Sequence, residues 1–279
     1  PETVAAIRGL IAEHDAQEVH VNTVVLDAPL EAARLEGRVR IVHVRELPAQ
    51  DHALCRNVGD TPERLRQTLL ATADRFVGNS PLVVEWLQCP ERTTLQMNQV
   101  DRRLFLMRFK PAPVLRFGLI SSNITKKGIG DAAKAAQLVA EAGCAVEILL
   151  IGPKTPDLEV QMARDISGLK APGYAESPWQ ALKQVDVVLS LSHFAESFGR
   201  TVLEAMAAGR PVICYDRGMP AWLVRPESEG RAECGLVIMP DDPQALCAAI
   251  QSLAADRDRL RRMSVAARKR AWRLNRHRG

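Results

Sequence analysis

The chain has 279 residues, of which 47% are hydrophobic and 25% are charged, and its formal net charge is +4. This composition is typical of a globular protein, and the length allows one large domain or two of ordinary size. No apolar run approaches the roughly 20 residues that a membrane-spanning helix needs, and the start is not a signal peptide. The six cysteines are scattered without a Cys-x-x-Cys pair, which favours reduced, mostly buried thiols over a metal site or a disulfide framework.

The positive charge is concentrated at the C-terminus, with ten Lys or Arg residues between Arg257 and Arg278. Two interpretations remain open. One is a solvated terminal helix, and the other is attraction to an anionic membrane surface. Nucleic acid is disfavoured, since aromatic residues make up 4% of the chain and no recognition motif accompanies the charge.

The first part of the chain alternates extended and helical patterns. Strands are predicted at residues 19–25, 39–44, 75–78 and 94–97. Helices are predicted at residues 3–13 and 28–35, after Thr61 and from Pro81. Because a parallel sheet of four strands leaves an edge uncovered, we expect this first domain to be incomplete.

Two prolines in Lys110-Pro111-Ala112-Pro113 make a stiff, extended connection, which predicts domains at residues 1–109 and 110–279. Beyond it the alternation restarts, with strands predicted at residues 114–121, 145–151, 187–189, 212–215 and 235–239. The pattern predicts an α/β protein with two Rossmann-like, doubly wound parallel sheets that bind ligands at the carboxyl ends of their strands.

Residues 185–215 read as strand, loop, helix and strand, which is the order of a βαβ unit. The helix is expected from about Arg200. The first N–H groups of a helix lack internal partners and carry roughly half a positive charge. Gly199 lets a ligand approach the backbone, and Thr201 adds a hydroxyl. We therefore expect this helix start to bind phosphate.

Two carboxylates, Glu196 and Glu204, flank that helix start. They are spaced so that they could accept hydrogen bonds from the hydroxyls at either end of a nucleotide-sugar. From the residues alone a second interpretation stays open, in which Glu196 is a solvated loop residue and Glu204 lies on the helix surface.

The segment ESFGRTVLEAMAAGRPVI, residues 196–213, closely resembles the signature of retaining, group-one glycosyltransferases of the GT-B fold. That signature is two glutamates separated by seven residues, within E-x-F-G-x-x-x-x-E-A-M-A-x-G-x-P-V. Three further segments resemble the family in the same order: ADRFVGNSPLVVEWL at 73–87, QMNQVDRRLF at 96–105 and TKKGIGDAAKA at 125–135. The resemblance covers roughly residues 19–255 and implies a GT-B fold.

The resemblance implies a role for each matching residue. Lys127 would neutralise the donor diphosphate, Glu196 would hold hydroxyls of the donor sugar, and Glu204 would hold the ribose. Around these three, the residues expected to bind the donor are Lys126, Gly173, Tyr174, Ser197, Phe198, Gly199, Arg200 and Thr201. No Asp-x-Asp pair ends a strand, and cations and helix N–H groups would stabilise the leaving phosphate, so no obligatory metal is expected.

The sequence departs from the family pattern in three places. The arginine six residues before the family's lysine is replaced by Ser121, for which Lys126 or Ser122 could compensate. The histidine that ends a first-domain strand is replaced by Arg45. His43, two residues earlier, is the candidate substitute, although a core or surface histidine is the other interpretation. The family's glycine-rich acceptor loop has no counterpart in the chain.

The sequence thus predicts a cytoplasmic retaining glycosyltransferase, associated with the inner face of a membrane. Its expected donor is a UDP- or GDP-sugar, and its expected acceptor a glycan or a lipid-linked molecule. A GT-B nucleotide-sugar epimerase and a catalytically impaired nucleotide-sugar-binding module remain as alternatives. A Rossmann dehydrogenase is disfavoured because no G-x-G-x-x-G follows the strand at residues 114–121.

Overall fold

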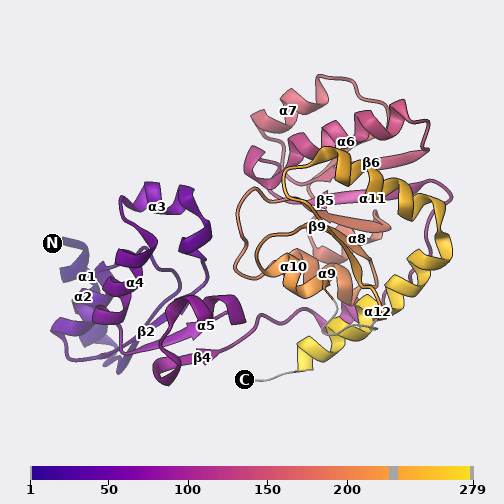
Figure 1. Ribbon diagram of the computed structural model, residues 1–279. Coiled ribbons are helices and arrows are strands. Elements are labelled where there is room, and N and C mark those ends of the chain that lie inside the picture. The colour runs from indigo at the N-terminus through magenta and orange to yellow at the C-terminus, as the bar shows by residue number, and fades with distance from the viewer. Residues whose placement is uncertain (1, 226–231, 277–279) are drawn as a thin grey trace. The chain divides into compact units, whose positions relative to one another are not determined.

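The computed structural model describes residues 2–225 and 232–276. Contacts along the chain define two compact units. Unit 1 comprises residues 2–98 with Ala195–Phe198, and unit 2 comprises Gln99–Phe194 with residues 199–276. Each unit is an α/β structure with a parallel sheet, which confirms the predicted fold class (Figure 1). The contacts divide the chain after Asn98, whereas the proline pattern places the domain boundary at Lys110, which stays a prediction.

Unit 1 contains a four-stranded parallel sheet whose strand order follows the chain, β1-β2-β3-β4. Its strands are β1 (Glu18–Val21), β2 (Val39–Val44), β3 (Arg75–Gly78) and β4 (Thr93–Leu95). Its helices are α1 (Glu2–Glu13), α2 (Ala28–Leu35), α3 (His52–Val58), α4 (Pro62–Thr72) and α5 (Pro81–Leu87), with short 3₁₀ turns at η1 (Pro48–Gln50) and η2 (Pro90–Arg92).

Capping side chains and prolines define where α4 and α5 of unit 1 begin. Thr61 caps α4 by accepting a hydrogen bond from the Arg64 backbone N–H, and Ser80 caps α5 in the same way through Val83. In both helices a proline occupies the first turn, where its missing N–H costs no helical hydrogen bond. Strand β1 ends at Val21 and is therefore shorter than the predicted strand at residues 19–25.

One face of the unit 1 sheet carries the core. Val42, Val44 and Phe76 point toward α2 and α4 and are almost fully buried, whereas His20 and His43 lie on the opposite face and are less buried. Strand β3 alternates between less buried and buried positions, whereas β2 also buries Ile41 next to Val42.

Unit 2 contains a six-stranded parallel sheet in the order β10-β9-β8-β5-β6-β7. Its strands are β5 (Leu115–Ile120), β6 (Val146–Ile151), β7 (Leu169–Gly173), β8 (Val187–Ser190), β9 (Val212–Tyr215) and β10 (Gly235–Ile238). Its helices are α6 (Ile129–Glu141), α7 (Pro156–Met162), α8 (Pro178–Lys183), α9 (Arg200–Ala207), α10 (Gly218–Val224), α11 (Pro243–Ala255) and α12 (Arg257–Arg276), with 3₁₀ turns at η3 (Arg102–Leu106) and η4 (Thr125–Lys127).

The strand order of unit 2 reverses between β5 and β8. The chain starts at β5, adds β6 and β7 on one side, and then returns to place β8, β9 and β10 on the other. The chain therefore leaves β5 and β8 toward opposite edges of the sheet, and the carboxyl ends of these two neighbouring strands mark the point at which ligands of doubly wound sheets bind. This point lies within unit 2.

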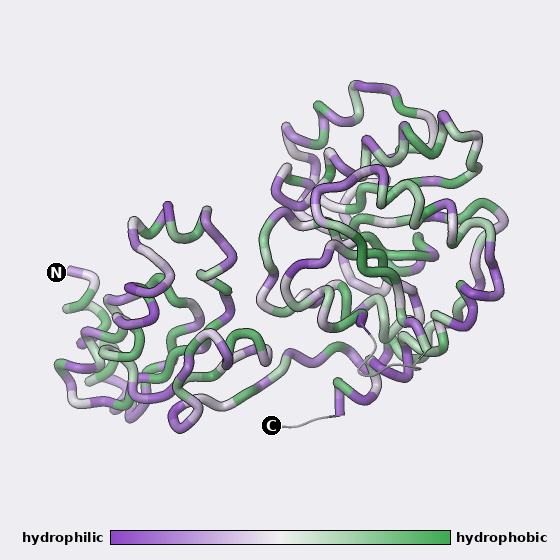
Figure 2. The backbone as a smooth tube through the Cα atoms, in the orientation of Figure 1, coloured by the Kyte–Doolittle hydropathy of each residue, from purple (hydrophilic) through white to green (hydrophobic). Residues whose placement is uncertain are grey.

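The core of unit 2 fills both sides of its sheet. Strands β8 and β9 are buried at nearly every position, and the central cluster includes Phe117, Leu150 and Ile213. Figure 2 shows the central strands as largely hydrophobic, whereas α12 alternates hydrophilic and hydrophobic residues. Continuous apolar runs of this kind are what a parallel sheet buried on both faces requires.

The sequence pattern missed β7, α3 and α10. Strand β7 reads LKAPG, which contains Lys170 and Pro172 and alternates in burial. It lies at the edge of the sheet, where a strand tolerates a proline because one side of its backbone needs no ladder hydrogen bond.

All six cysteines are free thiols, and five of them are buried, as the sequence predicted. None of the helices in the described part of the chain combines the length and apolar character that crossing a bilayer requires.

Candidate functional site

Helix α9 begins at Arg200, where the sequence predicted a helix start. Its N-cap, Gly199, adopts a left-handed conformation with φ of 77°, and no side chain caps this end. A Cβ at Gly199 would lie 3.0 Å from Pro220, so glycine also allows the turn to pack closely on α10. Arg200 and Thr201 form the first turn, where backbone N–H groups and the helix dipole favour an anion.

Glu204 is buried one turn further along α9. The residue is 8% exposed, and Arg200 donates a hydrogen bond from Nε to its carboxylate at 3.0 Å. Burial raises the pKa of Glu204, and the Arg200 charge and hydrogen bond partly offset that increase. The interpretation of Glu204 as a solvated residue on the helix surface is therefore wrong.

A cavity of about 600 Å³ opens beside Glu204 within unit 2. Besides Glu204 and Arg200 it is lined by residues of η3 and of the start of α8, namely Asp101, Arg103, Leu104, Leu106, Ser177, Pro178, Trp179 and Gln180. The half-buried Trp179 is its aromatic wall, and the Lys183 ammonium lies 5.4 Å from the centre of its ring.

Gly173 and Tyr174, which the resemblance implies for donor binding, do not line the cavity, and Tyr174 is 73% exposed. Trp179 was not predicted. The available signal was local, since Trp179 lies five residues after Tyr174.

Lys126 and Lys127 converge on one aromatic ring at the point where the strand order reverses. Both belong to η4, the turn after β5, and their ammonium groups lie 5.2 Å and 4.7 Å from the centre of the Phe194 ring. Phe194 belongs to the turn after β8. Phe194 was not predicted, because no local sequence pattern shows that these two turns meet.

A polar cluster supports the same two turns. Asp131, in the first turn of α6, accepts hydrogen bonds from His193 Nε2 at 2.8 Å and from the Tyr215 hydroxyl at 2.6 Å. Burial, together with the hydrogen bond to Asp131, raises the pKa of Tyr215. Arg217 pairs with Asp241 at 2.7 Å.

Three members of this cluster have side chains that metals bind. The potential ligand atoms of Asp131, His193 and Asp241 all lie within 4.8 Å of one another. Each of these side chains already has a hydrogen-bonding or ionic partner in the chain, so the arrangement is satisfied without a cation.

The remaining predicted residues group with unit 1. Ala195–Phe198 pack there, with Phe198 buried and Glu196 half-buried, and the Asn79 side chain donates a hydrogen bond to Ser197 Oγ at 3.0 Å. His43 lies within β2, with Nε2 at 2.9 Å from His20 Nδ1. Burial lowers the pKa of His43, with smaller contributions from His20 and Arg45, which favours the neutral imidazole.

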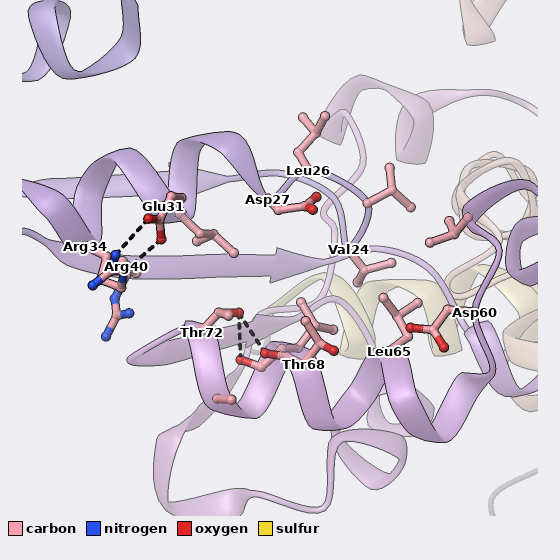
Figure 3. A pocket seen from close by; sticks show the side chains of 15 residues that line it. Val24, Leu26, Asp27, Glu31, Arg34, Arg40, Asp60, Leu65, Thr68 and Thr72 are labelled. Carbon is pink, nitrogen blue, oxygen red and sulfur yellow. Dashed lines mark hydrogen bonds and ion pairs between the residues drawn. The ribbon is translucent and has the colours of Figure 1, made fainter. Parts of the chain in front are cut away.

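A second cavity, of about 340 Å³, lies between α2 and α4 in unit 1 (Figure 3). Val24, Leu30 and Leu65 give it apolar walls, while Glu31 points to Arg34 and pairs with it. None of the residues predicted to bind the donor lines this cavity.

The two units, each with a Rossmann-like parallel sheet, define the class as doubly wound α/β proteins. The sequence model of the family described as "Glycosyl transferases group 1" matches residues 114–256, just over half of the chain. The chain belongs to this family.

Curated relatives agree with that assignment. The chain is 28% identical to a D-inositol 3-phosphate glycosyltransferase of Nocardia farcinica, in a match that covers 82% of this chain and 57% of that protein. It is 35% identical to the lipopolysaccharide core biosynthesis mannosyltransferase LpsB of Rhizobium meliloti, over 44% of this chain and 28% of that protein. The chain thus spans little more than half the length of the Nocardia relative.

Solved structures share the fold. Anabaena Alr3699/HepE in complex with UDP and glucose matches 97% of this chain and 76% of its own, with a TM-score of 0.80 at 19% identity. A sucrose-phosphate synthase from Thermosynechococcus elongatus matches 98% of this chain and 73% of its own, with a TM-score of 0.78 at 21% identity. These neighbours place the chain among proteins of the GT-B fold.

Proposed function

We propose that the chain binds a nucleotide-diphosphate sugar on unit 2 and transfers the sugar, with retention of anomeric configuration, to a glycan or lipid-linked acceptor. The observation that carries this proposal is the arrangement around the β5–β8 reversal. There two lysine ammonium groups meet at one ring, and the first turn of α9 begins in the same loop region after β8. Two adjacent cations and a helix N-terminus are suited to a diphosphate.

The nucleoside would occupy the cavity beside Glu204. A carboxylate accepts two hydrogen bonds from the 2′ and 3′ hydroxyls of ribose, and Trp179 offers a ring against which a base could stack. Because Glu204 is mostly removed from water, its hydrogen bonds to ribose would compete with few solvent interactions. HepE was solved with UDP, and we take UDP as the first donor nucleotide to test, with GDP as the alternative.

In the proposed reaction the bond between the anomeric carbon and the β-phosphate oxygen breaks. A bond from the acceptor oxygen to the same face of that carbon forms, and the acceptor proton passes to the departing phosphate. Lys127 and the N–H groups near Gly199–Thr201 stabilise the charge that develops on the phosphate. Glu196 orients the sugar through its hydroxyls. His43 has no role in this proposal, since it lies inside β2 and is paired with His20.

Calorimetric titration with UDP and GDP tests the proposal. Wild type should bind one of them, and Glu204→Gln should bind it about tenfold or more weakly, because a neutral amide is a poorer partner for two hydroxyls. Glu159→Gln is the matched control, since Glu159 is an exposed carboxylate at the start of α7. Binding of neither nucleotide by wild type, or equal binding by Glu204→Gln, would contradict the proposal.

Product analysis distinguishes the transferase from the two alternatives. Transfer to an added acceptor, or slow hydrolysis of the donor, supports the transferase. An epimerised donor would indicate a nucleotide-sugar epimerase, and nucleotide binding without turnover would indicate a binding module.

We also propose that α12 contacts an anionic membrane from the cytoplasmic side. The helix carries Arg262, Lys269 and Arg273 on its exposed face, along with the partly exposed Trp272, and no acidic residue follows Asp258 in it. Basic residues with an interfacial aromatic are suited to anionic headgroups, and such contact would keep the chain close to a lipid-linked acceptor.

A further inference from the structure

Lys126 and Lys127 share one aromatic neighbour. Both ammonium groups lie within 5.2 Å of the centre of the Phe194 ring, although Lys126 is exposed and Lys127 is half-buried. The face of an aromatic ring carries partial negative charge and attracts cations, so the ring restrains both lysines at one place.

The turn that carries Phe194 is fastened directly to the turn that carries the lysines. The His193 backbone N–H donates a hydrogen bond to the Lys126 carbonyl at 2.9 Å. Gly128 adopts a left-handed conformation with φ of 79°, and a Cβ there would lie 2.2 Å from the Leu191 carbonyl oxygen. Only glycine therefore allows the turns after β5 and β8 to pack this closely.

Side chains anchor the same turn from the other side. His193 Nε2 is bonded to Asp131 at the start of α6, and Asp131 is itself held by the Tyr215 hydroxyl at the end of β9. Arg217 donates to the Ser192 carbonyl at 3.2 Å. The Phe194 turn is thus tied to η4, to α6 and to β9, so the position of its ring is set by three elements.

We infer that Phe194 is a positioning residue that holds Lys126 and Lys127 where the terminal phosphate of the donor nucleotide binds. The inference rests on the proposed function and adds to it a residue that acts through the lysines. Phe194 does not line the nucleoside cavity, whose walls come from η3, α8 and α9. Loss of its ring should therefore weaken recognition of the second phosphate while recognition of the nucleoside and first phosphate is retained.

The test compares nucleotides that differ by one phosphate. UDP and UMP, and GDP and GMP, are titrated by calorimetry against wild type, Phe194→Leu and Phe194→Tyr. We expect Phe194→Leu to weaken binding of the diphosphate about fivefold and binding of the monophosphate less than twofold. Phe194→Tyr keeps a ring and should bind both as wild type does. Trp86→Leu is the control for loss of an aromatic side chain, because Trp86 is half-buried like Phe194 but lies in α5 of unit 1 and does not line the nucleoside cavity.

The outcomes separate the inference from the proposed function. If wild type binds the diphosphate and Phe194→Leu binds it equally well, the positioning role is refuted and the proposed function stands. Equal weakening of diphosphate and monophosphate, or equal weakening by Phe194→Tyr, also refutes it, because a general disturbance of the site has that pattern. If wild type binds none of the four nucleotides, the proposed function itself fails.

Discussion

The two units are built from similar elements, yet they differ in how their strands are ordered. The sheet of unit 1 follows the chain from β1 to β4, whereas the sheet of unit 2 starts in the middle and reverses between β5 and β8. At a reversal the chain leaves two adjacent strands in opposite directions, and ligands of doubly wound sheets bind at the carboxyl ends of those strands. Lys126 and Lys127 lie at that edge of unit 2, and the described strands of unit 1 contain no such reversal.

The units also differ in the burial of their strands. In unit 2, β8 and β9 are buried at nearly every position, while in unit 1 only one of the four positions of β1 and three of the six positions of β2 are buried. His43, the candidate that the sequence placed in unit 1, is on the less buried face and is paired with His20. Five predictions follow from these differences.

The largest effect is expected where the turns of unit 2 meet. Gly128→Ala should destabilise the protein by about 3 kcal/mol or more, because a Cβ would overlap the Leu191 carbonyl in a left-handed conformation. Gly143→Ala is the control, since its φ is also positive at 68° but no atom lies within 4 Å of a Cβ there. It should cost about 1 kcal/mol. Denaturant unfolding measures both, and equal costs would show that the close packing contributes nothing.

The second prediction compares one candidate from each unit. Lys127→Ala should weaken binding of the donor nucleotide about tenfold or more, since it removes a charge from the phosphate position. His43→Ala should leave that affinity unchanged. Calorimetric titration measures both variants, and a loss of affinity in His43→Ala as large as that in Lys127→Ala would contradict the assignment of the donor site to unit 2.

The third prediction concerns pH. Burial raises the pKa of Glu204 above its ordinary 4.5, so the folded state binds the proton more tightly and this contribution to stability is lost as pH rises through the folded pKa. As the pH rises from 4.5 to 7, the free energy of unfolding of Glu204→Gln should therefore increase relative to that of wild type. Unfolding free energies across that range measure the difference, and an unchanged difference would contradict the prediction.

Asp74 in unit 1 should behave in the opposite way. The Arg40 hydrogen bonds lower its pKa below the ordinary 3.8, so its contribution is present above that pH and is lost as pH falls through the folded pKa. Asp74→Asn should cost about 0.5–1 kcal/mol at neutral pH, because the ion pair is partly exposed. The cost should shrink in acid, and a cost that grows there would contradict this sign.

The smallest effect is expected on the surface of α12. Lys269→Ala should weaken binding to vesicles containing phosphatidylserine about fivefold, at about 1 kcal/mol per basic residue. Lys134→Ala on α6 is the matched control and should bind as wild type does. Co-sedimentation measures both, and vesicles of phosphatidylcholine alone should retain neither protein. Equal binding by wild type and Lys269→Ala would refute contact through this face.

Much of the fold followed from local patterns. Periodicity correctly placed the helix at residues 28–35 and the strands at residues 39–44 and 75–78. It could do so because the spacing of apolar residues is a local signal. Strand β7 was missed because Lys170 and Pro172 remove the apolar signal, and only its place at the sheet edge makes such a strand stable.

The sequence by itself determined the glycine-started helix α9, the position of Glu204 within it and the presence of a lysine pair after β5. Each depends on neighbours in the chain. Only the tertiary structure decided that the ammonium groups of Lys126 and Lys127 lie near the Phe194 ring. It alone also decided that η3 and Trp179 line a cavity beside Glu204. These contacts join segments far apart in sequence, and they depend on the strand order of the sheet, which no local pattern of hydrophobicity records.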